Sequence, residues 1–155
     1  MAVLTVLLPA FLAGGCDGDD EDAKDMQTPV IEMSGSGHFP QNCVTLKRGG
    51  SFTFRAKFSD NAELGNYNIE IHNNFDHHSH STGSEECEKD VKKTPVNAWV
   101  FNQDYSIPTG LKEFEASNEI TVPADVDTGD YHFMVRLTDQ SGWQQLIAVS
   151  LKIGE

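Results

Sequence analysis

Positively charged side chains are scarce in this sequence. Its 155 residues contain 11 Lys and Arg against 24 Asp and Glu, which gives a formal net charge of −13. Proteins that bind nucleic acid neutralise phosphates with clusters of Lys and Arg, and no such cluster is present. The charge balance therefore argues against a nucleic-acid partner, and also against electrostatic adsorption to an anionic membrane surface.

Long apolar runs are missing as well. The longest one lies at the N-terminus and reads MAVLTVLLPAFLA. A helix needs about 20 apolar residues to cross the hydrocarbon core of a bilayer, so this run is too short to be a membrane anchor. We interpret residues 1–15 as a signal peptide.

The signal peptide is followed by Cys16, and small residues directly precede this cysteine. This order resembles a bacterial lipobox, in which the cysteine is lipidated and becomes the first residue of the mature protein. The leucine stands one place further from the cysteine than usual, and no basic residue precedes Cys16. We expect a lipid anchor at Cys16 that holds the protein in the outer membrane of the cell envelope, facing the periplasm or the surface. The alternative is a non-lipidated secretory signal.

Apolar side chains are almost absent from the short stretch directly after Cys16. Residues 17–25 read DGDDEDAKD, and their mutual repulsion predicts a solvated tether over residues 16–27. An acidic stretch at this place also resembles the surface-export signal of Bacteroidota lipoproteins.

Cysteine is rare, with three residues in the chain. If Cys16 is lipidated, Cys43 and Cys87 are left and could form a disulfide, as in other exported proteins. A bridge across so long a loop would add about 3–4 kcal/mol to the free energy of unfolding. The alternatives are two free thiols or two soft metal ligands.

Helical periodicity is nearly absent, and apolar residues alternate with a period of two from residue 28 onward. Seven strands are predicted, and seven is the number typical of an immunoglobulin-like antiparallel β-sandwich, here over residues 28–155. The expected strands cover residues 30–33, 51–58, 67–71, 98–101, 120–122, 131–137 and 146–153.

One local motif supports this fold. Asp127-Thr128-Gly129-Asp130-Tyr131 matches the D-x-G-x-Y pattern in which the tyrosine hydroxyl binds back to the preceding corner. Antibody domains have a disulfide cysteine two residues after the tyrosine, whereas this chain has Phe133. We therefore expect apolar packing between the sheets at this position.

Histidine is the residue type that suggests chemistry. Four of the six histidines, His72, His77, His78 and His80, fall within nine residues. Neutral imidazole is a common ligand of transition metals. Alternation places His72 and His132 on the outward faces of two strands that are antiparallel neighbours in an immunoglobulin-like sheet. We predict a Zn²⁺ or Cu²⁺ site of these two histidines and one or two from the loop.

Several alternatives stay open at this site. Asp76, Glu70 or Glu85 could complete the ligand shell, or the histidines could be solvated surface residues without a metal. His38 is expected to be an ordinary residue. A Ca²⁺ site would use other side chains of the loop, but no EF-hand spacing is present. Its carboxylates would come from Asp76, Glu85, Glu86 and Glu88.

Catalytic motifs are absent. The chain has no G-x-S-x-G elbow, no H-E-x-x-H and no glycine loop for phosphate. No His or Cys follows His132, which excludes the C-terminal ligand series of a cupredoxin. A pair of carboxylates acting as acid and base is left open by the sequence, but no spacing favours one. We expect that the protein is not an enzyme.

The segment from Phe58 to His80, with its block IHNNFDHHSH, resembles the core motif of a Bacteroidota lipoprotein family that is catalogued as a domain of unknown function. The similarity covers residues from about 28 to 155. It implies a cell-envelope lipoprotein with an immunoglobulin-like domain, and it implies no activity.

Two functions of different classes follow. The first is a lipoprotein that captures Zn²⁺ or Cu²⁺ and feeds an uptake system in the outer membrane. The second is a metal-independent structural module that binds a protein or glycan in the envelope. Trp99, Phe101 and Tyr105 could supply aromatic contacts for it, although Trp99 and Phe101 fit a core position better.

Overall fold

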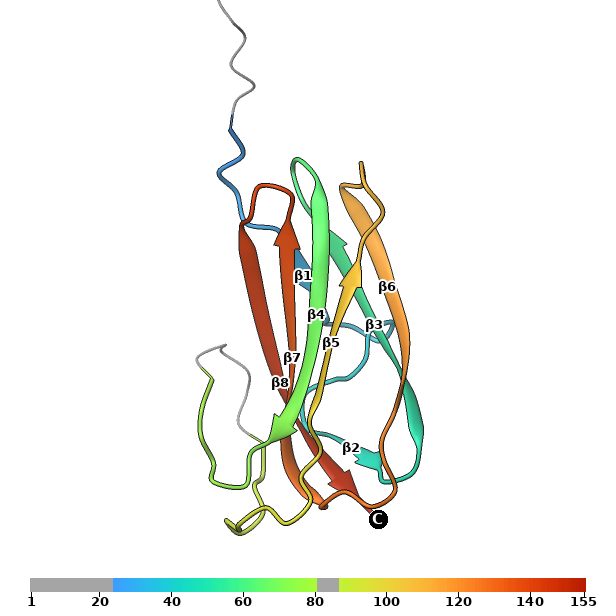
Figure 1. The fold of residues 1–155 in the computed structure, drawn as a ribbon, viewed down its shortest axis with the longest axis vertical. Coiled ribbons are helices and arrows are strands. Elements are labelled where there is room, and N and C mark those ends of the chain that lie inside the picture. Colours follow the sequence, from blue (N-terminus) through green and yellow to red (C-terminus); the bar gives the residue numbers. More distant parts are fainter. Residues whose placement is uncertain (1–23, 81–86) are drawn as a thin grey trace, which may run out of the picture.

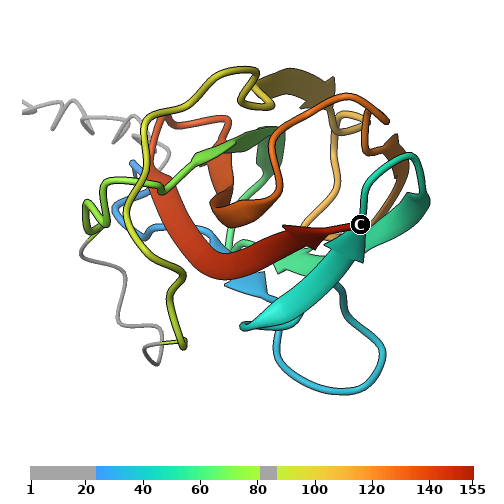
Figure 2. The same cartoon turned by 90° about the horizontal axis from the view of Figure 1, so that it is seen from below.

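The computed structural model describes residues 24–80 and 87–155, and these residues form an all-β fold of two facing sheets (Figure 1). Seen from below, the two layers enclose a common interior (Figure 2). No described residues form a helix that is long and apolar enough to cross a membrane. The strands are β1 (Val30–Glu32), β2 (Val44–Lys47), β3 (Ser51–Ser59), β4 (Leu64–Asn73), β5 (Phe101–Ser106), β6 (Glu113–Thr121), β7 (Gly129–Asp139) and β8 (Gln144–Gly154).

The smaller sheet has the strand order β1-β3-β6, and the larger one has the order β2-β8-β7-β4-β5. All neighbours are antiparallel except β2 and β8, which run parallel. The prediction of a purely antiparallel sandwich is therefore wrong at this pair. After β1 the chain crosses to the other sheet, and β2 then runs alongside β8 in the same direction.

The strand count also differs from the prediction, because the described residues contain eight strands and not seven. The additional strand is β2. A strand was expected over residues 98–101, but β5 begins at Phe101, and Trp99 is buried in the loop before it. Similarly, β6 begins at Glu113, well before the short strand expected at residues 120–122.

The core lies between the sheets and follows the predicted alternation. Tyr67, Ile69 and Ile71 of β4 are buried, and so are Tyr131, Phe133, Val135 and Leu137 of β7. In the first half of β7 the alternate residues are buried as well, including His132 and Met134. The segment that follows β4 covers this outer face, since a hydrogen bond joins His132 to the carbonyl oxygen of His78.

The hydroxyl of Tyr131 fixes the corner before β7, as the D-x-G-x-Y motif predicts. It donates to the carbonyl oxygen of Asp127 at 2.7 Å and accepts from the backbone N–H of Trp99 at 3.2 Å. The carboxylate of Asp127 also accepts hydrogen bonds from the backbone N–H groups of Val96 and Asn97, which lower its pKa. The corner thus attaches the loop before β5 to the start of β7.

Tyr131→Phe is expected to lower the free energy of unfolding by about 1–3 kcal/mol, because the Trp99 N–H and the Asp127 carbonyl lose their buried partner. Urea unfolding measures the effect. Tyr105→Phe removes a hydroxyl from the edge strand β5 and serves as the control. Equal stability of Tyr131→Phe and the unmodified protein would show that the corner contributes nothing.

Candidate metal centre

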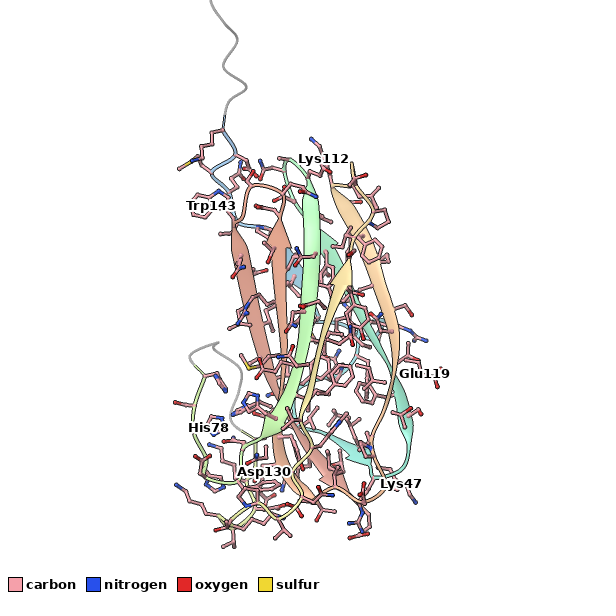
Figure 3. The ribbon with its side chains drawn as sticks, in the orientation of Figure 1. Lys47, His78, Lys112, Glu119, Asp130 and Trp143 are labelled. Carbon is pink, nitrogen blue, oxygen red and sulfur yellow. A yellow bond between two sulfur atoms is a disulfide. The ribbon has the colours of Figure 1, made fainter. Side chains whose placement is uncertain are left out.

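Four histidine side chains meet on the outer face of the larger sheet. Strands β4 and β7 pair so that His72 lies directly opposite His132, as the alternation predicts. The chain leaves β4 at Asn73 and turns back over the same face, which brings His78 and His80 to this pair. Figure 3 shows the labelled His78 beside the end of β4. Every pair of the four imidazole rings has its centroids within 4.6–5.6 Å.

Three of the four histidines direct a nitrogen atom toward a common point. The Nε2 atom of His72 lies 3.1 Å from Nε2 of His80 and 3.3 Å from Nε2 of His78. Ligand nitrogens of all three lie within 4.8 Å of one another. Two nitrogens around a tetrahedral Zn²⁺ are about 3.4 Å apart, because each Zn–N bond is about 2.1 Å long. The observed spacing therefore suits a bound ion.

Carboxylates orient two of these rings. Oε1 of Glu70 lies 2.9 Å from Nδ1 of His72, and Oδ1 of Asp76 lies 2.6 Å from Nδ1 of His78. The hydrogen bond with His78 also lowers the pKa of Asp76, so this group is an ionised acceptor. Carboxylates accept hydrogen bonds, so both Nδ1 atoms donate, and in a neutral ring the Nε2 atom then presents its lone pair. Lone pairs that face each other repel, and a cation between them removes this repulsion.

Completion of the ligand shell by a carboxylate was left open by the sequence, and the structure places Glu70 and Asp76 behind the histidines, on the nitrogens that face away from the common point. Such carboxylate–histidine pairs orient metal ligands and raise their basicity. The sequence contains a signal for Glu70, because residues two apart on a strand share a face.

Glu70→Ala is expected to weaken zinc binding by roughly 10–100-fold, the usual cost of losing an outer partner of a ligand. Competition with a chromophoric chelator measures the affinity. Asn68→Ala changes another polar residue on the same face of β4 and should leave the affinity unchanged. If Glu70→Ala binds zinc as the unmodified protein does, Glu70 does not orient His72.

His132, which was predicted as a ligand, lies beside the three convergent nitrogens and not among them. Its ring centroid is 4.6 Å from that of His80, and its Nε2 atom lies 3.3 Å from the carbonyl oxygen of His78. The side chain is buried, with 7% of the residue exposed. Burial, assisted by the neighbouring histidines, lowers the pKa of His132 to about 4, although the hydrogen bond to His78 opposes this shift. A neutral His132 therefore supports the backbone at His78.

Burial also lowers the pKa of His80, and the nearby His72 and His78 lower it further. A lowered pKa keeps this imidazole neutral at physiological pH. Neutral imidazole is the form that binds metal, so the environment of His80 favours ligation.

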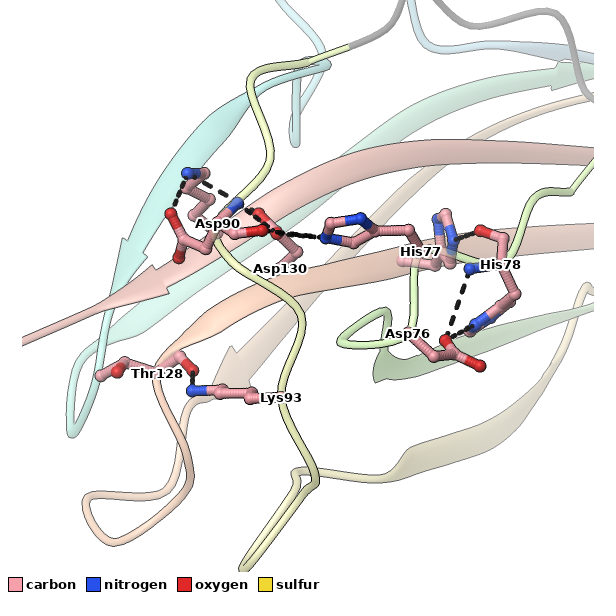
Figure 4. Close-up of polar contacts among 9 residues, drawn as sticks. Asp76, His77, His78, Asp90, Lys93, Thr128 and Asp130 are labelled. Atoms are coloured by element: carbon pink, nitrogen blue, oxygen red, sulfur yellow. Dashed lines mark hydrogen bonds and ion pairs between the residues drawn. The ribbon is translucent and has the colours of Figure 1, made fainter.

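The structure does not bring His77 into the group. This residue has a positive φ of 62°. Its Nε2 atom lies 2.9 Å from the carbonyl oxygen of Asp90 and 3.8 Å from Oδ2 of Asp130. Figure 4 shows His77 directed toward these two residues while His78 is directed toward Asp76. His38 also lies apart, in the loop between β1 and β2, where its Nδ1 atom is 2.7 Å from the carbonyl oxygen of Ser34.

A disulfide joins Cys43 to Cys87, with the two Cα atoms 5.4 Å apart. It attaches the segment after His80 to the chain just before β2. Nearby, the carboxylate of Asp130 accepts the backbone N–H of Asp90 at 2.7 Å, and Lys152 contacts both aspartates. These contacts hold the β4–β5 connection against β7 and β8.

Some predicted features lie outside the described residues. They are the signal peptide, the lipidated Cys16, most of the acidic tether, and Glu85 and Glu86. Residues 24–27, expected to belong to the tether, are described. The indole Nε1 of Trp143 donates to the carbonyl oxygen of Asp25 at 2.9 Å, so this part contacts the sandwich.

Taken together, the protein is a β-sandwich that carries a cluster of carboxylate-oriented histidines on one outer face. Residues 15–154 match the family described as a domain of unknown function (DUF4625), and the chain therefore belongs to this family. No curated protein matches the chain.

Proposed function

We propose that this protein is a cell-envelope lipoprotein whose β-sandwich binds one transition-metal ion, Zn²⁺ or Cu²⁺, through His72, His78 and His80. The convergence of three imidazole nitrogens supports this proposal most strongly. Hydrogen bonds from two of the rings to carboxylates add to it. Three protein ligands leave a coordination position for water or an exchanging ligand, which suits capture and transfer of the ion to an outer-membrane uptake system.

The donor set favours these two ions. Imidazole ligands suit Zn²⁺ and Cu²⁺, and affinity for divalent metals rises along the first row up to Cu²⁺. Oxygen-preferring ions such as Mg²⁺ would find no carboxylate among the three convergent side chains, since Glu70 and Asp76 bind the far sides of the rings.

Titration of the purified, untagged full-length chain with Zn²⁺ and Cu²⁺ tests the proposal. One ion per chain should bind, and His80→Ala should lose this binding. His77→Ala changes a histidine of the same loop that lies outside the group, so it should bind as the unmodified protein does. Equal binding by His80→Ala would overturn the proposed site.

We further propose that the sandwich is a variant of the immunoglobulin-like fold and that the protein is an outer-membrane lipoprotein of Bacteroidota. The antiparallel pairing of β4 with β7 and the hydrogen bond of Tyr131 support the fold proposal. The small residues before Cys16 and the acidic stretch after it support the anchor.

Cys16→Ala is expected to abolish incorporation of labelled fatty acid and to release the protein from the membrane fraction, because the thiol is the proposed site of lipidation. Metabolic labelling and fractionation of expressing cells measure both effects. His38→Ala leaves all three cysteines in place and serves as the control. Undiminished labelling of Cys16→Ala would refute the anchor.

The second candidate is a metal-independent module that binds a protein or glycan. Exposed valines favour it, since Val91 and Val96 are 90% and 92% exposed in the segment before β5. The aromatic residues expected to make such contacts are packed inward: Trp99 is buried, and Tyr105 stacks on Tyr67 at 5.0 Å. A partner captured equally with and without chelator, and lost in a Val91→Ser, Val96→Ser variant, would favour this function.

A further inference from the structure

Three carboxylates meet at the other end of the sandwich. Asp25 precedes β1, Asp60 follows β3, and Asp139 ends β7. One oxygen from each lies within 4.8 Å of an oxygen from each of the others. In Figure 1 the entering chain, the β3–β4 turn and the β7–β8 turn lie together at the top, and Figure 3 labels Trp143 there and His78 near the opposite end. The group is therefore remote from the histidines.

Each of these carboxylates has one oxygen that is fixed by hydrogen bonds from nearby groups. The donors are backbone N–H groups of the same segment and, for Asp25, also the side-chain amide of Asn61 in the β3–β4 turn. The contacts are Asp25 Oδ1 with Gln27 N at 3.1 Å and Asn61 Nδ2 at 2.9 Å, Asp60 Oδ2 with Ala62 N at 2.7 Å and Glu63 N at 2.8 Å, and Asp139 Oδ1 with Trp143 N at 2.8 Å.

The second oxygen of each carboxylate is buried and has no hydrogen-bond partner among the described residues. These atoms are Oδ2 of Asp25, Oδ1 of Asp60 and Oδ2 of Asp139. Asp139 is itself only 3% exposed. Within residues 24–80 and 87–155, none of the three carboxylates forms an ion pair with Lys, Arg or His. Burying carboxylate oxygens without a partner is costly, and three negative charges so close together repel one another.

We infer that Asp25, Asp60 and Asp139 form a Ca²⁺ site. Carboxylate oxygens from separate loops are typical ligands of Ca²⁺, which takes six to eight oxygens in flexible geometry and can fill its shell with carbonyls and water. Mg²⁺ demands near-ideal octahedral geometry and keeps most of its water, and Zn²⁺ or Cu²⁺ would prefer the histidine nitrogens. The affinity should lie at about 0.1–1 mM, the range of extracellular Ca²⁺ modules.

The position of Asp25 gives this site a structural consequence. Asp25 belongs to the segment that leads from Cys16 into the domain, whereas Asp60 and Asp139 belong to the sandwich. A bound Ca²⁺ therefore attaches the entering chain to the domain, beside the hydrogen bond from Trp143 to the carbonyl oxygen of Asp25. Calcium would thus fix the direction in which the domain leaves its anchor.

Thermal unfolding of the full-length chain, with and without about 10 mM Ca²⁺, tests the inference. Calcium should raise Tm by about 5 °C, because the ion binds the folded state only. Asp139→Asn and Asp25→Asn should abolish this rise. Asp25→Asn keeps an oxygen that can accept the hydrogen bonds from Asn61 and Gln27, so the variant should still fold. Glu119→Gln, an exposed change on β6, should leave the rise intact.

Terbium luminescence gives a second, spatial readout. Tb³⁺ replaces Ca²⁺ at oxygen sites and emits when a tryptophan close by is excited, and Trp143 contacts both Asp25 and Asp139. Emission should appear in the full-length chain, decline when Ca²⁺ is added, and disappear in Trp143→Phe. That variant keeps all three carboxylates and should keep the rise in Tm.

Three results would overturn the site: no change in Tm at about 10 mM Ca²⁺, an equal rise with Mg²⁺, or a full rise in Asp25→Asn. None of them depends on the histidine cluster, so the inference and the proposed function can fail separately.

Discussion

Replacing His72 by alanine is expected to abolish stoichiometric zinc binding. His72 contributes the nitrogen that lies closest to both partners, 3.1 Å from His80 and 3.3 Å from His78. Its loss leaves two histidines, both on the segment that follows β4. The weakening should exceed the roughly 10–100-fold that loss of an outer partner causes, because a ligand is removed and not merely disoriented. Isothermal titration calorimetry with Zn²⁺ measures the effect.

His132→Ala is the informative comparison for this experiment. Because His132 contacts the backbone of His78 and lies outside the convergent group, its loss should weaken zinc binding less than the loss of His72. If His132→Ala abolished binding while His72→Ala kept it, the assignment of the ligands would be wrong.

The second large effect is expected from the disulfide. Replacing Cys43 and Cys87 together by alanine should lower the free energy of unfolding by about 4 kcal/mol, since the bridge closes a loop with a sequence separation of 44 residues. The same loop contains His72, His78 and His80, so the double variant should also bind zinc more weakly. Urea unfolding and zinc competition titration measure the two effects.

Substitution is preferable to chemical reduction here, because reduced thiols are themselves zinc ligands. The double variant is compared with His38→Ala, a change in the same β1–β2 loop away from the bridge. Unfolding of the double variant at the urea concentration of the unmodified protein would show that the bridge does not constrain the unfolded chain.

The parts of the fold that alternation specifies could be predicted from the sequence. In β4 and β7 apolar residues alternate, and this pattern fixes which face packs into the core between the sheets. The face-to-face position of His72 and His132 follows from the same pattern, once the two strands are neighbours. The corner at Tyr131 was also predictable, since a short motif encodes it.

A short strand and a strand with little alternation could not be predicted. Strand β2 alternates over four residues only, which is too short a pattern to stand out, and its parallel pairing with β8 depends on the path of the whole chain. Strand β5 reads FNQDYS and lies at the edge of its sheet. Its polar side chains are exposed to solvent there, so the strand shows little apolar alternation. The expected strand was therefore placed too early in the sequence, on the apolar residues that precede β5.

Within the site, the sequence did not distinguish the loop histidines. His77 and His78 are adjacent, and the left-handed backbone of His77 directs only one of them to His72. Such a choice depends on the conformation of the loop. The three aspartates were missed for a different reason: they are far apart in the chain, and Asp25 looked like one more acid of the tether.

The metal content of the untagged full-length chain, purified without chelator, tests the central claim most directly. Elemental analysis should find close to one Zn or Cu per chain, and His72→Ala purified in parallel should contain almost none. A protein that holds no metal even after incubation with Zn²⁺ and Cu²⁺, or equal metal content in both proteins, would contradict the account of the histidine cluster as a metal centre.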